Sequence, residues 1–276
     1  LYTNGKNVTS HADINDEDQT VHYPKIRTKA TDKNTGLDET LAKGDQTIID
    51  IVSYENLVIG EKYTVKGKLM DKSTGTALLV NGKEVAVEKE FTADKVKGTI
   101  DLEFTLDASS LEGKTTVVFE DLYNSDVKVT THSDIKDEGQ TIRFPKVTTN
   151  ALDKDSQLNE GMSKKEVTVV DKVNYYNLKK GETYKVSGVL MDKDTGEKFL
   201  VNGEPVTTEK EFVAEDTDGF VTLEFTFDGS ALENKTLVVF EDLYHSSKHV
   251  GTHTDITDED QTVRYPKIRT SAIDKE

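Results

Sequence analysis

Three copies of one polar pattern hold the side chains best suited to chemistry. The pattern His-x-Asp-x-x-Asp-x-x-Gln-Thr begins at His11, His132 and His253, so consecutive copies lie 121 residues apart. An imidazole and carboxylates can move protons, and a glutamine carboxamide presents an electrophilic carbon. Chemistry at that carbon needs a nucleophile that meets it across the fold.

A threonine and a glutamate are predicted to face the core together with this glutamine. Successive side chains of a strand alternate between its two faces, so a polar residue in phase with apolar ones points inward. Buried polar groups are costly unless they bond one another, so the three are expected to meet. The sets in phase are Val147, Thr149 and Ala151, then Gln140, Ile142 and Phe144, and then Val118, Glu120 and Leu122. Positions 121 residues away give the matching residues of the other unit in each case, which are Thr28, Gln261 and Glu241.

Two interpretations of such a cluster stay open at this point. In the first, the cluster is an ordinary buried hydrogen-bond network, and the histidine belongs to a solvated loop. In the second, the threonine hydroxyl attacks the glutamine carbonyl carbon and expels ammonia, which leaves an ester. That step needs a base, a donor to the developing oxyanion and leaving group, and a site without water. His132, Glu120 and the acids Asp134 and Asp137 are groups of these types.

The elements around these residues are predicted to be short antiparallel strands. Apolar and polar residues alternate with period two, and turn signals such as Asn81-Gly82 separate the alternating runs. No stretch keeps a helical apolar stripe for three turns. The sequence therefore predicts an all-β protein with two tandem immunoglobulin-like β-sandwich domains.

The period of 121 residues also predicts the boundaries of the units. We expect the C-terminal fragment of a preceding repeat over 1–24, complete domains over 25–145 and 146–266, and the start of a following repeat over 267–276. Tyr23-Pro24 and Phe144-Pro145 leave almost no linker, which favours a stiff rod.

Composition excludes several classes of function for these 276 residues. The formal net charge of −17 argues against nucleic acid as a partner, because phosphate binding needs clustered Lys and Arg. No apolar run reaches the ~18 residues of a membrane span, so no membrane contact is expected. The lack of cysteine removes thiol catalysis, cysteine zinc sites and iron–sulfur clusters. We expect a monomer without cofactor or metal.

Three motifs taken together resemble a known family. They are Thr-x-Ala-x-Asp at the start of each unit (Thr28 to Asp32, Thr149 to Asp153), Val-Val-Phe-Glu-Asp-Leu in its middle, and the His-to-Gln pattern at its end. This combination is similar to the ester-bond repeats of the VaFE type, which occur in the stalks of Gram-positive surface adhesins. In that family an acid pair shares a proton and polarises the glutamine amide, while histidine assists proton transfer from threonine.

The resemblance implies a role for each matching residue. It implies a Thr28–Gln140 ester assisted by Glu120, His132 and Asp137, and a Thr149–Gln261 ester assisted by Glu241, His253 and Asp258. His132 has the strand phase of polar residues, so a local bend is needed to bring it to the site.

The function implied is structural, and alternatives are weighed against it. The chain would form stalk repeats of an extracellular adhesin, anchored to the bacterial cell wall by a segment outside this sequence. Its partners would be neighbouring repeats, with a host ligand held only by a distal domain. Such chemistry would be a single turnover in cis, so the chain would not be an enzyme. A ligand-binding sandwich with a non-covalent cluster is the alternative, while calcium, zinc and a Lys–Asn isopeptide fit the residues less well.

Overall fold

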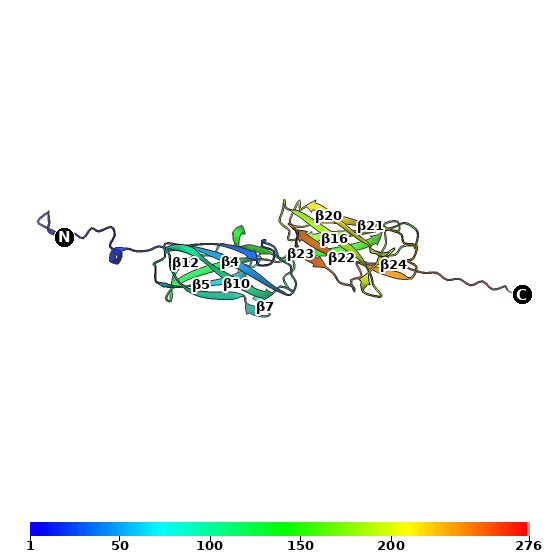
Figure 1. Cartoon of the computed structure of the whole chain (residues 1–276), viewed down its shortest axis with the longest axis horizontal. Helices are drawn as coiled ribbons and strands as arrows, with labels where there is room; N and C mark the ends of the chain where they lie inside the picture. Colours follow the sequence, from blue (N-terminus) through cyan, green and yellow to red (C-terminus); the bar gives the residue numbers. More distant parts are fainter. Residues whose placement is uncertain (275–276) are drawn as a thin grey trace.

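Two β-sandwich domains lie end to end in the computed structural model, which describes residues 1–274 (Figure 1). An extended segment precedes the first domain, and another follows the second. Within the described residues the helical segments are two 3-10 turns, η1 (Glu17–Gln19) and η2 (Glu138–Gln140). No helix in this part of the chain is long and apolar enough to cross a membrane. The all-β class predicted from the alternating pattern is confirmed.

The first domain has two antiparallel sheets. The three-stranded sheet has the order β10 (Lys97–Asp107), β4 (Asp45–Glu55), β3 (Lys25–Asp32). The larger sheet has the order β12 (Val127–His132), β11 (Thr115–Asn124), β5 (Lys62–Asp71), β6 (Thr76–Ala77), and β13 (Thr141–Arg143) and β9 (Ala86–Thr92) pair with β11 and β5. The first strand of the domain and its last strand therefore lie in different sheets.

The second domain repeats this topology. Its three-stranded sheet has the order β14 (Lys146–Asp153), β15 (Val167–Tyr176), β21 (Gly219–Phe227). The other sheet has the order β17 (Glu197–Lys198), β16 (Thr183–Asp192), β22 (Lys235–His245), β23 (Lys248–His253), with β20 (Thr207–Val213) on β16 and β24 (Thr262–Tyr265) on β22.

A small hairpin projects from each domain at the predicted Asn-Gly turn. In the first domain it joins β7 (Leu79–Val80) to β8 (Lys83–Glu84), and in the second β18 (Leu200–Val201) to β19 (Glu204–Pro205). Asn81 and Gly82 have φ values of 52° and 76°. Two consecutive left-handed residues are what a two-residue hairpin turn requires, and Asn-Gly adopts them with little strain.

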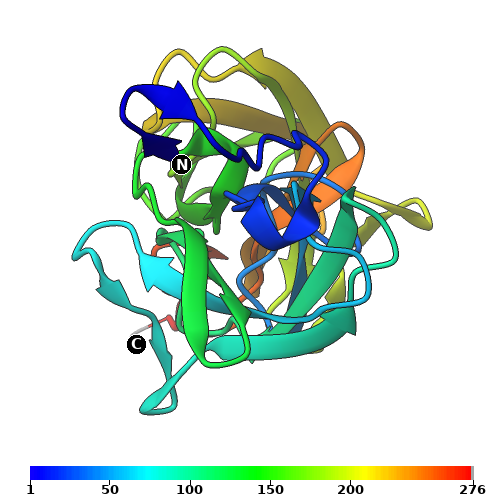
Figure 2. The same cartoon turned by 90° about the vertical axis from the view of Figure 1, so that its left-hand side faces the viewer.

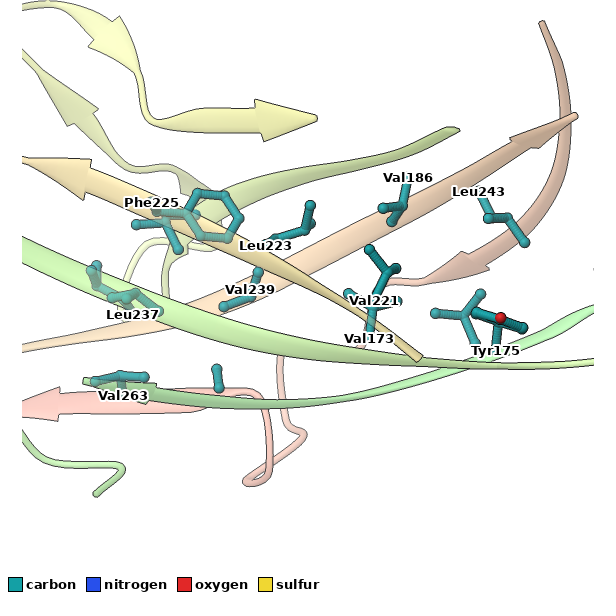
Figure 3. Close-up of a cluster of buried hydrophobic side chains, with 14 of the residues drawn as sticks. Val173, Tyr175, Val186, Val221, Leu223, Phe225, Leu237, Val239, Leu243 and Val263 are labelled. Atoms are coloured by element: carbon teal, nitrogen blue, oxygen red, sulfur yellow. The ribbon is translucent and has the colours of Figure 1, made fainter. Parts of the chain in front are cut away.

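Each domain buries its own hydrophobic core between its two sheets. Figure 3 shows this in the second domain, where Val173, Val221 and Phe225 of one sheet meet Val186, Val239 and Val263 of the other. All six side chains are at most 6% exposed. Glu241 lies between the core residues Val239 and Leu243 on its strand, so the polar site is set within such a core.

The first residues of the chain stand apart from both cores. They form a two-stranded hairpin, β1 (Tyr2–Thr3) and β2 (Lys6–Asn7), followed by an extended run and η1, as Figure 2 shows from the amino-terminal side. Ile14 and Tyr23 are 94% and 79% exposed. A hairpin this short has no apolar face to bury.

Candidate functional site

Four elements of the first domain converge where its two sheets meet. Strand β3 of the smaller sheet carries Thr28 and lies against β12, η2 and β13 of the larger one. Gln140 is the last residue of η2, directly before β13, and its side chain is fully buried. A bond from Thr28 to Gln140 would therefore join the two sheets to each other.

Glu120 of β11 bridges the two predicted reactants in the first domain. Its Oε1 accepts a hydrogen bond from Gln140 Nε2 at 2.9 Å, and its Oε2 accepts one from the Thr28 hydroxyl at 3.3 Å. Glu120 is 1% exposed and Gln140 is 0% exposed. The threonine, the glutamate and the glutamine thus meet as the strand phases predicted.

The second domain brings its reactants into direct contact. Gln261 Nε2 donates to Thr149 Oγ1 at 2.7 Å and to Glu241 Oε2 at 2.7 Å. The hydroxyl oxygen therefore lies beside the carboxamide whose carbon it would attack. Thr149 is 6% exposed, so water has little access to this contact.

A β-bulge brings the histidine into the site. Along β12 and β11 the pairing runs Glu120 to His132 and Leu122 to Thr130, but then Tyr123 to Lys128, which leaves Val129 as an extra residue. An extra residue reverses the strand phase beyond it. His132 therefore lies across from Glu120 although Lys128 points outward, and this is the local bend that the sequence required. The second domain has the same irregularity, with Glu241 across from His253.

Asp137 orients this histidine. His132 Nε2 lies 2.8 Å from Asp137 Oδ2, while Asp137 Oδ1 caps η2 by accepting from the Gly139 backbone N–H at 2.8 Å. His253 and Asp258 are 2.9 Å apart in the second domain, where Asp258 accepts from the Asp260 N–H in the same way. The side chains of Asp137 and Asp258 thus bond the imidazole and not the glutamine carboxamide.

The carboxyl group paired with Glu120 comes from a residue that the strand-phase reading of the sequence did not single out. Asp50 of β4 is fully buried and shares an inward face with Ile48 and Val52. Asp171 has the corresponding place beside Glu241 and is also fully buried. The signal was present in the sequence, because an acid in phase with apolar neighbours recurs 121 residues later.

Burial and mutual repulsion make each pair hold a proton. Loss of solvation raises the pKa of Asp50 to about 6, and that of Glu120 rises to about 10 because burial and the Asp50 charge act together. The pKa of Asp171 is likewise raised to about 6 and that of Glu241 is raised, mainly by burial. Because each charge disfavours ionisation of the other buried group, the pair keeps one proton at neutral pH.

Apolar side chains of the opposite sheet close over the acid pair. Gly67 lies across from Glu120, and a Cβ there would sit 2.6 Å from Leu102 Cδ1 and 2.7 Å from Phe104 Cζ. Gly188 has the same relation to Glu241, with Phe225 Cζ at 2.6 Å. The missing side chain lets the two sheets approach closely, which excludes water beside the carboxyl groups.

The glutamine carbonyl oxygen is one of several site oxygens without a hydrogen-bond partner in the described part of the chain, together with the carboxyl oxygens of Asp50 and Asp171. Oε1 of Gln140 and Oε1 of Gln261 are buried without a hydrogen-bond partner among residues 1–274. This atom gains negative charge when a nucleophile adds to the carbonyl carbon. The acid pair contacts the departing nitrogen, because Glu120 and Glu241 accept hydrogen bonds from Nε2 of the glutamines.

The first copy of the pattern keeps its local contacts without the rest of the site. His11 Nε2 bonds Asp16 Oδ2, and Asp16 caps η1 through the Asp18 N–H at 3.0 Å. Gln19, however, is exposed. Thr270, which has the phase of the nucleophile, is exposed as well.

One family model matches nearly the whole chain. The family is described as the T-Q ester bond containing domain, and it matches residues 1–23, 24–144 and 145–265. No curated protein matches the sequence. The three matched segments follow the same period as the polar pattern.

Several solved structures are distantly similar to this chain. Two crystal forms of a bacterial adhesin from Mobiluncus mulieris, described as containing intramolecular disulfide, isopeptide and ester bond cross-links, are 16% identical, with TM-scores of 0.39 and 0.40. Each match covers 80% of this chain and 81% of the adhesin. A glycosyl hydrolase family 2 member from Bacteroides cellulosilyticus is 12% identical with a TM-score of 0.31, over 76% of this chain and 28% of the hydrolase.

Proposed function

Because the chain belongs to the family of T-Q ester bond containing domains, we propose that each complete domain cross-links itself through an ester, Thr28 to Gln140 and Thr149 to Gln261. The observation that supports this most directly is the buried contact of 2.7 Å between Gln261 Nε2 and Thr149 Oγ1. A nucleophile and an electrophile held this way react as parts of one molecule, which removes most of the entropic barrier.

The residues around the contact supply each step of the reaction. The Thr oxygen adds to the Gln Cδ while its proton passes toward His132 or His253, which Asp137 or Asp258 holds in place. The acid pair donates its proton to the carboxamide as charge develops there. The C–N bond then breaks, ammonia leaves with the transferred proton, and the ester remains. The chain is consumed in one turnover, so it acts on itself and is no turnover enzyme.

The cross-link suits a protein that carries load between two ends. Its termini lie at opposite ends of a row of two domains (Figure 1), so tension enters each domain through its first and last strands. The bond ties these strands, and pulling would stretch covalent bonds before strand hydrogen bonds. We propose that the chain is part of the stalk of a cell-surface adhesin, anchored to a bacterial cell wall outside this sequence.

Intact mass of the purified chain tests the proposal. We expect a mass below the sequence value by two ammonia molecules. Thr28→Ala and Thr149→Ala should each restore one of them. Glu120→Gln should leave the fold intact but prevent the loss of ammonia in the first domain, and the second domain should still lose its own. Thr28→Ser, which keeps the hydroxyl, is the matched control and should still cross-link. An unshifted wild-type mass would return the cluster to a non-covalent hydrogen-bond network.

A further inference from the structure

The two domains meet through a loop of the first domain, residues 35–41, that lies against the second. Leu37 packs on the hydrophobic core of the second domain. Asp38 Oδ2 accepts from Lys179 Nζ at 2.9 Å and also faces Arg143 of its own domain at 3.3 Å. The loop therefore makes both apolar and charged contacts across the junction.

Glu39 is the centre of this junction. It is fully buried, its Oε1 accepts from the Tyr184 hydroxyl at 2.5 Å, and its Oε2 bonds His245 Nδ1. The rings of Tyr184 and His245 pack together with centroids 4.7 Å apart. A buried carboxylate is tolerated only where donors replace its water, so these donors make the contact specific.

The second domain carries the same loop in the same backbone conformation, over residues 156–162. In the first domain the Thr40 N–H donates to Arg143 O at 3.0 Å and the Arg143 N–H to Asp38 O at 2.9 Å. The second domain repeats both bonds, Gly161 to Arg264 at 2.8 Å and Arg264 to Asn159 at 2.9 Å. Glu39 and Glu160 form the same parallel bridge with Arg143 and Arg264. The loop therefore adopts this conformation without a neighbouring domain against it.

Exposure is what distinguishes the two loops. Leu158 and Met162 are 59% and 73% exposed, and Glu160 is exposed, whereas the matching Leu37 and Leu41 are half-buried and Glu39 is buried. Two large apolar side chains flank a carboxylate on a rigid turn. Residues 156–162 thus have the same kinds of side chain as the covered loop 35–41, but no described residue of the chain covers them.

We propose that residues 156–162 form a docking surface for the amino-terminal end of another copy of this repeat, joined head to tail. The inference rests on the stalk function proposed above. In the docked state the Glu160 carboxylate accepts from a tyrosine hydroxyl of the incoming domain, and Leu158 packs beside it.

The receiving end is also repeated, which makes the contact heterologous. Tyr184 accepts from the Lys179 N–H at 2.8 Å while it donates to Glu39, and Tyr63 of the first domain accepts from the Val58 N–H at 3.0 Å in the same way. Each domain thus has a carboxylate loop at one end and a tyrosine at the other. Surfaces of this kind propagate from copy to copy unless the rotation between copies closes a ring.

Two substitutions make the junctions unequal. Asn159 replaces Asp38, so the second loop cannot form the ion pair with a lysine at the position of Lys179. Asn124 stands where His245 stands in the second domain. A copy of the second domain therefore offers Glu160 the same tyrosine and histidine that Glu39 has, which defines the best probe.

The test extends the full chain in frame after Glu276 with a second copy of residues 156–266, which completes a third domain. Solvent-exposed carboxyl groups are then labelled chemically and mapped by peptide mass. In the existing chain Glu160 should react and Glu39 should be protected. In the extended chain labelling of Glu160 should fall to the level of Glu39, and Leu37→Ser should raise labelling of Glu39 only.

The decisive variant is Glu160→Gln, read by hydrogen exchange of residues 156–162. It should change nothing in the existing chain and should increase exchange in the extended chain. Undiminished labelling of Glu160 in the extended chain would overturn the docking surface. Ammonia loss from the third domain is measured on the same sample, and its failure would count against the ester alone, because the labelling of Glu160 is read separately.

Discussion

The first copy of the polar pattern and the copy in the first complete domain share their local contacts but differ in the burial of the glutamine. In both, histidine bonds the aspartate five residues later, and that aspartate caps a 3-10 turn ending at the glutamine. Gln19, however, is exposed, whereas Gln140 is fully buried against Glu120. The segment forms its local contacts without the rest of the domain. The buried environment of the glutamine, by contrast, requires the complete sandwich.

This difference separates two kinds of contribution to the chemistry. The histidine–aspartate contact needs only a short stretch of chain. The acid pair needs strands β4 and β11 from two sheets, and the dry environment needs the side chains above Gly67. A complete pattern without its sandwich should therefore be inert, and Gln19 serves as an internal control.

Removal of the acid pair should have the largest effect. Asp50→Asn keeps the shape of the side chain but removes the shared proton, so ester formation in the first domain should slow by about 10² to 10⁴-fold. Ammonia release followed by mass gives the rate, and the Thr149–Gln261 bond of the same molecule is the control. Equal rates in both domains would assign Asp50 a purely structural role.

Loss of the cross-link should have the next largest effect, on stability. The Thr28→Ala, Thr149→Ala double variant opens two loops whose ends are 112 residues apart in the second domain. Loop-closure entropy predicts a loss of about 5 kcal/mol per domain, which should lower the melting temperature by more than about 10 °C.

Calorimetry of this double variant against the wild type, with Thr28→Ser, Thr149→Ser as the control, measures that effect. A hydrogen bond lost with one hydroxyl accounts for only about 1 kcal/mol. Equal melting temperatures would show that the bond adds nothing to equilibrium stability and would leave it a purely mechanical role.

A smaller effect is expected from pH on the uncross-linked double variant. The pKa of Asp50 is raised from 3.8 to about 6 in the folded state. An acid whose pKa is raised by folding stabilises the folded state while it is protonated. Its contribution is therefore complete below about pH 4 and is lost as pH rises through about 6. This group alone should lower stability by up to about 3 kcal/mol per domain between pH 4 and pH 7, and the raised pKa of Glu120 adds to the fall. Urea unfolding at several pH values measures this, and adding Asp50→Asn and Asp171→Asn should make the profile shallower, while the raised pKa values of Glu120 and Glu241 keep a remaining slope.

The smallest effect on stability is expected at the aspartate that all copies share. Asn caps a turn about as well as Asp, so Asp137→Asn should change unfolding free energy by less than about 0.5 kcal/mol. It removes the carboxylate from His132, so ester formation in the first domain should slow while the bond still completes. Asp16→Asn should alter neither quantity. A full-rate Asp137→Asn variant would show that the imidazole needs no orienting acid.

Strand phase predicted much of this site and failed where geometry is not regular. It brought Thr28, Glu120 and Gln140 together, because each lies in an uninterrupted alternating run. Asp50 has the same inward phase as Ile48 and Val52, but its strand contains none of the three motifs, so it was not predicted to belong to the site. The histidine could not be placed from its own phase, since the bulge at Val129 is invisible to a two-residue period.

The junction between the domains lay beyond such reasoning altogether. Glu39 and His245 are 206 residues apart, and their contact depends on the rotation of one domain against the next. No alternation encodes that rotation. The repeat itself held the available hint, because Asn124 and His245 differ where most core positions agree.

The placement of the two reactants has a consequence for how such a chain is made. Thr28 lies on the first strand of its domain, and Gln140 is followed only by the short last strand. A polypeptide that emerges from its amino end presents the nucleophile early and the carboxamide last. No covalent ring can close on a half-made domain, so the chain stays a linear thread that can pass through a narrow channel until each unit is complete. With the proposed ester chemistry, each domain then closes in order, behind the advancing end.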